Sequence, residues 1–392
     1  MNIHNLAEKY KSEIINWRRS IHQNPELGFE EVQTIKFIEN VLSEKGISFK
    51  KVANDKGLIA SIGQGKPVIG IRADMDALPI QEETGLPFAS KNPGKMHACG
   101  HDAHVAMVLG AACILADLPE KPPGEFRLIF QPSEERGDEN WLSGARHIIS
   151  SGQIDDLDVL IGLHVFPNIP AGKLGVLTGP TLASGDYFEA TIKGKGGHDS
   201  QVHETIDPIF ITCQVVNAIY GIRTRRLNPL RNATISINTV HAGTSGNIVP
   251  QEVKISGTIR CFDEETRQKI KNYLKKMLTI SHQFDGDFEL NIGTGVPVLQ
   301  NDKNVANQIR DSIISLYGED ALEEVEKLLG VDDFAWYSQI VPSAMFFLGV
   351  QPDGENYPIH HPKFNINENA LSIGSSVLAQ SAINLMVENV GA

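Results

Sequence analysis

The sequence predicts an α/β fold in which an open, mainly parallel sheet forms the main domain and a smaller α+β domain is inserted into it. Short apolar runs alternate with helical patterns, and potential metal ligands follow these runs. In the middle of the chain the predicted strands and helices follow a different order. With 392 residues, 41% of them hydrophobic, the chain can bury a large core and divide into about two or three domains.

The main domain is predicted from apolar runs of strand length. These runs are residues 68–71, 126–130, 159–163 and 344–350. Helical patterns cover residues 101–117, 305–316 and 370–387, and residues 1–19 form an amphipathic helical pattern. Strands that alternate with helices favour an open, mainly parallel sheet, in which ligands bind beyond the carboxyl ends of the strands.

The middle of the chain predicts a βαββαβ unit. Its strands are expected at residues 187–193, 233–240, 253–260 and 288–292, and its helices at 206–223 and 264–282. Glycine-rich joints at residues 178–185 and 293–295 bracket the unit. We therefore expect a discontinuous main domain, residues 1–184 and 293–392, and an inserted domain, residues 185–292.

Composition excludes several classes of protein. A formal net charge of −13 at pH 7 would repel phosphate backbones, so a nucleic-acid partner is not expected. Four cysteines are too few for a disulfide framework, which favours a reducing compartment. The longest apolar run, residues 106–116, is too short for a membrane span, and the N-terminal pattern does not resemble a signal peptide. We expect a cytoplasmic protein.

Cys99 and His101 are the strongest metal-ligand candidates. They stand two positions apart before a predicted helix, and Zn²⁺ prefers sulfur and nitrogen donors. The alternative, about equally weighted, is a capped helix start with exposed histidines and a buried cysteine. Because the sequence lacks a second cysteine pair and a Pro-Cys-x-x-Cys motif, it excludes a closed structural zinc site and a nucleobase deaminase. The remaining ligands would be histidine and carboxylate, as in catalytic sites.

Carboxylates follow the first two predicted strands. Glu134 and Glu135 are adjacent, so one could bind metal while the other acts as a general base; alone, they would more simply be a solvated acidic loop. Asp74 and Asp76 could orient imidazoles or bind metal, or could form a turn. For the pair at 332–333 a helix N-cap is favoured over an orienting role.

The inserted domain contributes weaker candidates. Glycines before His198 could let its imidazole project into a cleft, although an exposed turn is the simpler interpretation. Asn247 and Arg260 could hold a carboxylate, Arg260 through its guanidinium fork, but a surface arginine is the simpler interpretation for that residue alone.

Taken together, the motifs resemble the amidohydrolase branch of the dinuclear zinc aminoacylase and carboxypeptidase family, to which hippurate hydrolase, the auxin-conjugate hydrolases and archaeal carboxypeptidases belong. The resemblance extends from about residue 22 to the C-terminal helix. The motifs that carry it are Arg72-Ala-Asp-Met-Asp-Ala-Leu-Pro79, Met96-His-Ala-Cys-Gly-His-Asp102, Phe130-Gln-Pro-Ser-Glu-Glu135, Gly162-Leu-His164, Gly194-Lys-Gly-Gly-His198, Asn247-Ile-Val-Pro250 and Gly257-Thr-Ile-Arg260.

The resemblance implies a zinc-peptidase catalytic domain with an inserted lid and dimerisation domain. It implies two divalent metal ions per subunit, most simply Zn²⁺, with Co²⁺ or Mn²⁺ as alternatives. The metal ligands it implies are Cys99, His101, Glu135, His164 and His361. Glu134 matches the general base that takes a proton from the metal-bridging water, and His198 matches a lid histidine that stabilises the oxyanion in the partner's active site. Asn247 and Arg260 match residues that hold the substrate carboxylate, and Asp74, Asp76 and Asp102 are expected to hold the ligands in place.

The implied activity is metal-dependent hydrolysis of N-acyl-amino acids or of C-terminal residues of short peptides. A homodimer through the lid, or a tetramer, is expected. Alternatives are deacetylation of a biosynthetic N-acetyl intermediate, dipeptide hydrolysis, and noncatalytic metal-dependent binding of amino-acid conjugates. The loops after Glu135 and after His198 depart from the family's usual sequence, so the acyl group and the amino acid are not determined.

Overall fold

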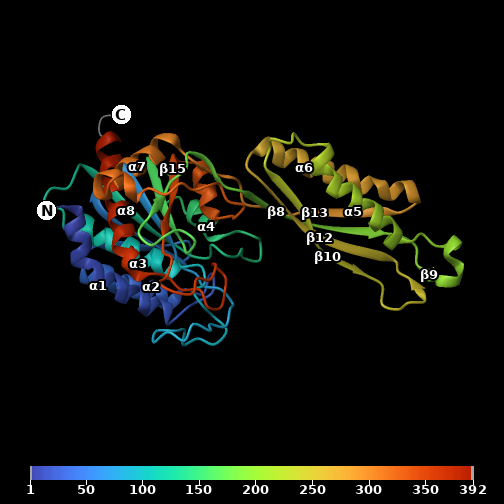
Figure 1. The fold of residues 1–392 in the computed structure, drawn as a ribbon, viewed down its shortest axis with the longest axis horizontal. Helices are drawn as coiled ribbons and strands as arrows, with labels where there is room; N and C mark the ends of the chain where they lie inside the picture. The colour runs from blue at the N-terminus through green and yellow to red at the C-terminus, as the bar shows by residue number, and fades with distance from the viewer. Residues whose placement is uncertain (1, 390–392) are drawn as a thin grey trace. The chain divides into compact units, whose positions relative to one another are not determined.

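The computed structural model describes residues 2–389, which divide into two compact units (Figure 1). Unit 1 contains Met1–Gly179, Gln300–Glu326 and Asp332–Ala392, and unit 2 contains Pro180–Leu299 and Lys327–Val331. The insertion predicted at residues 185–292 falls within unit 2. The short strands β7 (Gly179–Leu182) and β14 (Leu299–Asn301) include the residues at which the chain passes from one unit to the other.

Unit 1 is built on a seven-stranded sheet of order β1-β2-β4-β3-β5-β15-β6. Its strands are β1 (Ser48–Val52), β2 (Gly57–Gln64), β3 (Val68–Asp74), β4 (Gly124–Gln131), β5 (Val159–Phe166), β6 (Leu174–Gly175) and β15 (Ser343–Gly349). The four central strands, β4, β3, β5 and β15, run parallel, and antiparallel strands flank them. The predicted sheet is confirmed, and each of the four apolar runs is one of its parallel strands.

Helices cover this sheet. They are α1 (Ile3–His22), α2 (Val32–Glu44), α3 (His101–Ala116), α4 (Gly144–Ser150), α7 (Lys303–Tyr317) and α8 (Leu371–Asn389), with short 3₁₀ helices η3 (Glu319–Ala321), η4 (Asp333–Gln339) and η5 (Glu368–Ala370). Helix α3 packs against both α1 and α8, and nearly all of its residues are buried. That environment explains why its sequence is apolar on every face.

One helical stretch, Glu368–Asn389, is long and apolar enough to cross a membrane by length and composition alone. However, 72% of its apolar window is buried inside the protein. Side chains such as Val377, Leu378 and Leu385 belong to the core of unit 1. Burial of this kind is expected of a core helix, and it accounts for the apolar composition.

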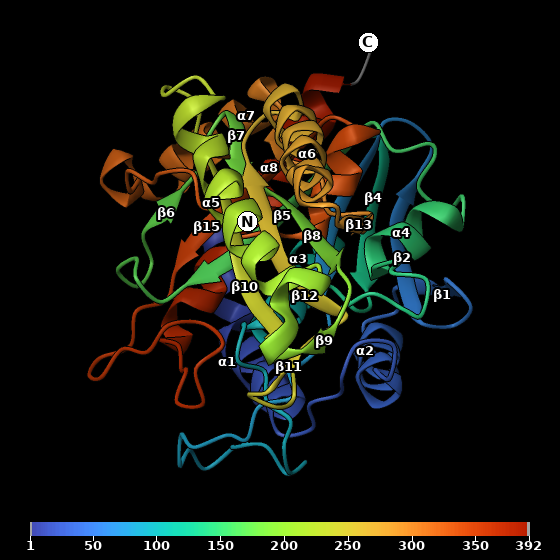
Figure 2. The same cartoon turned by 90° about the vertical axis from the view of Figure 1, so that its right-hand side faces the viewer.

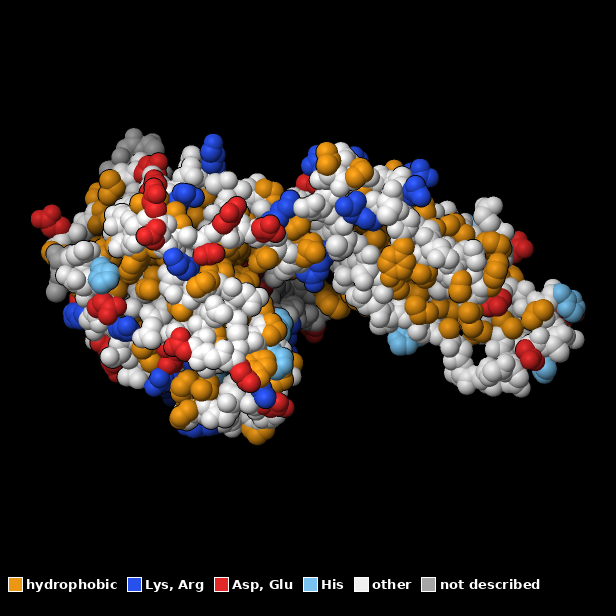
Figure 3. All heavy atoms as spheres, viewed as in Figure 1, with side chains coloured by type: hydrophobic (Ala, Val, Ile, Leu, Met, Phe, Trp, Pro, Cys, Tyr) orange, Lys and Arg blue, Asp and Glu red, His pale blue; other side chains and the backbone are white. Residues whose placement is uncertain are grey.

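Unit 2 has the predicted βαββαβ order. Its strands β8 (Ser184–Lys193), β10 (Ala233–Ala242), β12 (Glu252–Cys261) and β13 (Asp287–Ile292) form an antiparallel sheet of order β10-β12-β8-β13. Helices α5 (Pro208–Arg225) and α6 (Glu264–Leu278) pack on one face of it (Figure 2). The remaining elements are β9 (Gly197–His198), η1 (Asp199–Glu204), β11 (Ile248–Val249) and η2 (Thr279–Phe284). Phe210 and Tyr220 of α5 are exposed apolar side chains. Figure 3 shows that hydrophobic side chains form part of the surface.

Candidate active site

The candidate site lies where parallel strands of unit 1 end beside the start of α3. Strand β3 ends at Asp74, β4 ends at Gln131, and His164 lies near the end of β5. Because parallel strands present their carboxyl ends at one edge of a sheet, residues far apart in the sequence meet there.

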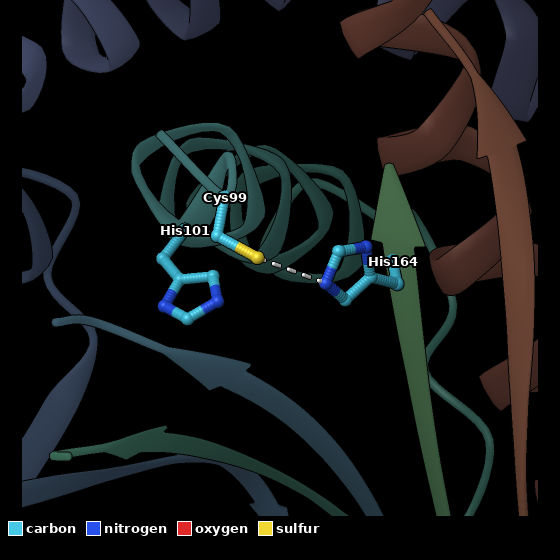
Figure 4. Close-up of side chains that lie close together, drawn as sticks. All are labelled: Cys99, His101 and His164. Atoms are coloured by element: carbon cyan, nitrogen blue, oxygen red, sulfur yellow. Dashed lines mark hydrogen bonds between the residues drawn. The ribbon is translucent and has the colours of Figure 1, made fainter. Parts of the chain in front are cut away.

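Cys99, His101 and His164 form the centre of the site. Their ligand atoms all lie within 4.8 Å of one another (Figure 4). Nδ1 of His164 lies 2.8 Å from the carbonyl oxygen of Val165, which can only accept a hydrogen bond, so this nitrogen carries the proton. Nε2 of His164 therefore presents a lone pair, and it lies 3.5 Å from Cys99 Sγ. His164 thus has the protonation pattern of a metal ligand.

His101 is held by a carboxylate in the same manner. Its Nδ1 lies 3.1 Å from Asp76 Oδ1, while its Nε2 is buried without a hydrogen-bond partner among the described residues. The second oxygen of Asp76 accepts a hydrogen bond of 3.0 Å from the backbone N–H of Glu135. Asp76 therefore contacts two predicted ligands at once.

A second group joins Cys99 to Glu135 and His360. His360 Nε2 lies 3.4 Å from Cys99 Sγ and 3.1 Å from Glu135 Oε1. The backbone N–H of His360 donates to Ala98 O at 2.7 Å, and its φ of +65° is unusual for a residue other than glycine. Backbone held in a sparsely populated conformation is concentrated at functional sites.

His361, the residue expected from the sequence, is not part of this group. Its ring stacks on Tyr357 at 4.6 Å between ring centroids, and its Nδ1 accepts a hydrogen bond from the backbone N–H of Lys363. The structure therefore brings His360, and not the sequence-predicted His361, beside Cys99 and Glu135. The reason is the left-handed backbone at His360, which decides which of two adjacent imidazoles faces the cysteine.

His104 is a contributor that sequence reasoning did not single out. Its Nδ1 lies 2.6 Å from Asp74 Oδ1, and its Nε2 accepts a hydrogen bond from the backbone N–H of Val165. Both nitrogens are occupied, so His104 braces the site and offers no lone pair to a metal. Its spacing of three residues from His101 on one helix could have indicated it.

Asp74 braces the site through other residues. Besides His104 it contacts Arg72 Nη1 at 2.6 Å, and its nearest approach to His101 Nε2 is 3.6 Å. The contacts of Asp74 are thus mainly with His104 and Arg72, which are not predicted ligands. Arg72 also pairs with Asp332 at 3.3 Å and Asp333 at 2.9 Å. Asp332 accepts a hydrogen bond from the N–H of Phe334 and so caps η4, as the sequence favoured.

Glu134 lies among these carboxylates. One of its oxygens accepts a hydrogen bond of 3.3 Å from the N–H of Asp333, and it approaches both His101 and Glu135. Burial, together with the charges of Asp332, Glu135 and Asp333, raises the pKa of Glu134 well above its ordinary value. A carboxyl with a raised pKa is suited to exchanging protons near neutral pH.

Asp102 does not contact a predicted ligand. Its Oδ2 lies 2.7 Å from Arg18 Nε and 2.7 Å from His22 Nδ1, both on α1. His22 also contacts Glu82 at 3.2 Å. The structure therefore places Asp102 against α1 and not against the predicted ligands, because successive side chains at the start of α3 point to different neighbours.

The candidate site residues of unit 2 lie at two separate places. His198 is exposed, accepts a hydrogen bond from the N–H of Ser200, and lies close to Asn247, whose carbonyl accepts from Asp199. Arg260 donates to Leu329 O at 2.6 Å near the far end of β12. With about 3.3 Å per residue, the eight steps from Glu252 to Arg260 span roughly 26 Å. Asn247 and Arg260 of one chain therefore do not meet on one carboxylate.

The unit 1 residues fit a metal centre. Imidazole nitrogens, a thiol and a carboxylate converge in a space that is buried at Cys99, His101 and His164 and open at His360, and this donor set suits Zn²⁺ or Co²⁺. Burial raises the pKa of the Cys99 thiol well above its ordinary value, with Glu135 adding to the effect. Metal binding would displace that proton and satisfy the nitrogen of His101 that lacks a partner.

Comparison with known proteins identifies the family of the chain. The family model described as peptidase family M20/M25/M40 matches residues 70–384. The chain belongs to the M20/M25/M40 peptidase family. As a member of this family it is a hydrolase that acts on amide or peptide bonds.

Relatives of this M20 protein align along nearly their whole length. Thermostable carboxypeptidase 2 of Saccharolobus solfataricus is 39% identical, covering 96% of this chain and 98% of the relative. N-acetyl-L-cysteine deacetylase of Bacillus subtilis is 38% identical, covering 97% and 89%. The crystal structure of the Bacillus subtilis YXEP protein, described as a dinuclear metal binding peptidase, superimposes with a TM-score of 0.85 at 36% identity and covers 97% of this chain and 99% of that chain.

Proposed function

We propose that this M20 hydrolase cleaves the amide bond of N-acyl-amino acids or the C-terminal residue of short peptides, with Glu134 as the general base. The observation that carries the proposal is the position of Glu134 beside a group of ligands with unoccupied lone pairs. A noncatalytic binding protein would not need a second carboxylate next to Glu135.

Two divalent cations are proposed at Cys99, His101, Glu135, His164 and His360, most simply as Zn²⁺. Two observations support a pair of ions: Cys99 belongs to both groups of donors, and the YXEP relative is described as dinuclear. When bound, such ions polarise a carbonyl and increase the acidity of water.

The protein's own residues carry the proton transfers. The hydrogen bond from Asp333 holds one oxygen of Glu134, which orients the carboxylate for its task. Glu134 would take a proton from the attacking water and pass it to the departing amine. The raised pKa of Glu134 makes the protonated state accessible between these two steps.

A homodimer through unit 2 is proposed because the substrate-binding candidates separate within one chain. Strand β10 is an edge strand, and its residues from 238 to 242 are exposed. Antiparallel pairing of β10 with its copy about a twofold axis would bring the Asn247 end of one sheet beside the Arg260 end of the other. His198 and Asn247 of one copy would then act together with Arg260 of the second. A tetramer would need a further surface.

A cytoplasmic location is proposed from the cysteines. Cys99, Cys113, Cys213 and Cys261 are all free, and reducing compartments keep thiols in that state. A nucleic-acid partner is not proposed, because the net charge is −13.

The test is release of free amino acid from a panel of N-acetyl, N-benzoyl and benzyloxycarbonyl amino acids and free dipeptides. Purified protein is stripped with chelator and then reloaded with Zn²⁺, Co²⁺ or Mn²⁺. We expect activity to vanish on stripping and to return on reloading. A preference for N-acetyl substrates would favour the deacetylase alternative, which the Bacillus relative supports. Full metal loading with no turnover on any substrate would contradict the proposal.

A further inference from the structure

Glu31 occupies the N-cap position of α2 but does not cap that helix. Its side chain makes no capping hydrogen bond. The carboxylate of Glu26 serves instead, because it accepts hydrogen bonds from the backbone N–H groups of Gln33 at 3.0 Å and Thr34 at 2.9 Å. The N–H groups at the start of α2 are therefore capped without Glu31, so capping does not explain the position of the Glu31 side chain.

The carboxylate of Glu31 is buried and is directed at the segment that precedes Glu134. Glu31 is only 1% exposed, and its Oε1 accepts a hydrogen bond of 2.8 Å from the backbone N–H of Ser133. Its Oε2 is buried with no hydrogen-bond partner among residues 2–389. Burying a half-satisfied carboxyl disfavours folding, so stability alone does not explain this residue.

Ser133 has a conformation that needs such support. Its φ is +42°, in the left-handed region that side chains other than glycine rarely adopt. Its hydroxyl donates to Arg136 O at 2.9 Å, and its carbonyl accepts from Gly144 N at 2.9 Å. Gly28 lies so close that a Cβ there would collide with the Ser133 side chain. The turn at Ser133 is thus fixed by several contacts, and one of them is the hydrogen bond that Glu31 accepts from the Ser133 N–H.

We propose that Glu31 is a positioning residue for the general base: by holding the Ser133 N–H, it maintains the turn that aims Glu134 at the site. This inference rests on the proposed function. Each carboxylate accepts a hydrogen bond from a different residue: Asp76 from the N–H of Glu135, and Glu31 from the N–H of Ser133. The backbone on both sides of Glu134 is therefore fixed by buried carboxylates from other parts of the chain.

Three variants test the proposal in the full-length, metal-replete protein. Glu31→Ala removes the acceptor, Glu31→Gln keeps an acceptor oxygen, and Glu26→Ala loosens the same helix start without touching Ser133. We measure kcat and KM, bound metal, and amide hydrogen exchange of the peptide that spans residues 130–137. The exchange measurement reports on the turn whether or not a substrate is turned over.

For Glu31→Ala we expect kcat to fall about 10- to 100-fold with KM within about twofold, because small displacements of a catalytic group are costly. Exchange in the peptide should accelerate while metal content stays unchanged. Glu31→Gln should restore both properties, and Glu26→Ala should lower the Tm alone. Wild-type kcat and exchange in Glu31→Ala would overturn the proposal, as would an equal loss of kcat in Glu26→Ala. If the wild type hydrolyses no substrate, the proposed function fails, while the exchange data still decide whether Glu31 fixes the turn.

Discussion

Two buried polar groups meet at the first two residues of α3, and they differ in what their side chains contact. His101 turns to the donor group, where its Nε2 has no partner among the described residues. The side chain of Asp102 points to Arg18 and His22, and its Oδ2 lies 2.7 Å from a nitrogen of each, whereas its Oδ1 has no hydrogen-bond partner among the described residues. A carboxylate that is paired with a buried guanidinium, as Asp102 is with Arg18, contributes to holding the chain together. A group with lone pairs directed into a common space is incomplete until something binds there.

Replacing Glu134 should have the largest effect on the incomplete group. For Glu134→Gln we expect kcat to fall by a factor of about 10²–10⁴, because the base is lost while the shape is kept. Thermal stability should be retained or should increase, since one of several crowded carboxylates is removed. Steady-state kinetics with metal analysis and thermal unfolding measure both quantities. Turnover within tenfold of the wild type, with metal retained, would show that another group is the base.

Variants of two adjacent histidines test which of them belongs to the incomplete group. His360→Ala should weaken metal binding and lower activity by at least about 10- to 100-fold, the range for groups that only support a ligand. His361→Ala removes a ring that stacks on Tyr357 and should change activity by no more than about threefold. Metal titration of both apo variants tests this order. A larger loss in His361→Ala would restore the assignment first made from the sequence.

The group around Asp102 is tested with Asp102→Asn. We expect the free energy of unfolding to fall by about 3–5 kcal/mol, because the Arg18 guanidinium loses a buried partner. Burial alone would raise the pKa of Asp102, but Arg18 and His22 hold it well below its ordinary value. The contribution to stability is therefore present above the unfolded pKa of about 4 and is lost progressively as the pH falls from there toward the lower folded pKa.

Urea unfolding at pH 7 and at pH 3.5 measures this dependence, and the difference between wild type and variant should shrink in acid. Bound metal and kcat per folded molecule provide the control. A variant that folds as stably as the wild type but loses metal would return Asp102 to the role of supporting the ligands.

The smallest expected effect concerns Glu31 and pH. Burial, with the charge of Asp76 adding to it, raises the pKa of Glu31 from 4.5 to about 8. Between these values the folded protein binds more protons than the unfolded chain, so the contribution of Glu31 to stability declines as the pH rises. Glutamine does not ionise, so the stability of Glu31→Gln relative to wild type should increase from pH 5 to pH 8. Unfolding curves at both values check the sign, and a constant difference would contradict it.

The fold was largely predictable because buried strands have a plain signature. The apolar runs at 68–71, 126–130, 159–163 and 344–350 all became central parallel strands. The βαββαβ unit was also predicted in the correct order. Strand β1 was not predicted because it is largely exposed and forms the edge of the sheet, whereas β2 was also missed although it is mostly buried and lies inside the sheet. Edge strands bury too little to be distinguished by composition.

The site was predictable only where a residue's environment could be inferred from its own segment. Cys99, His101 and His164 came together because strand ends and helix starts converge at one edge. The choice between His360 and His361 depends on one left-handed residue in an irregular loop, which composition does not encode. Glu31 was missed because its sequence pattern is that of an ordinary helix start, and only its long-range contact with Ser133 reveals another use.

The position of unit 2 within the chain affects the order in which unit 1 is completed during synthesis. Strand β15 pairs with β5, and both it and His360 follow the whole of residues 180–299. A growing chain that has emerged from the ribosome only as far as unit 2 lacks one central strand and one metal-ligand candidate. Such long-range pairing slows folding, because the intervening segment must be closed into a loop first. We therefore expect translation to deliver the last part of the metal centre late, and chains truncated after unit 2 to lack a complete one.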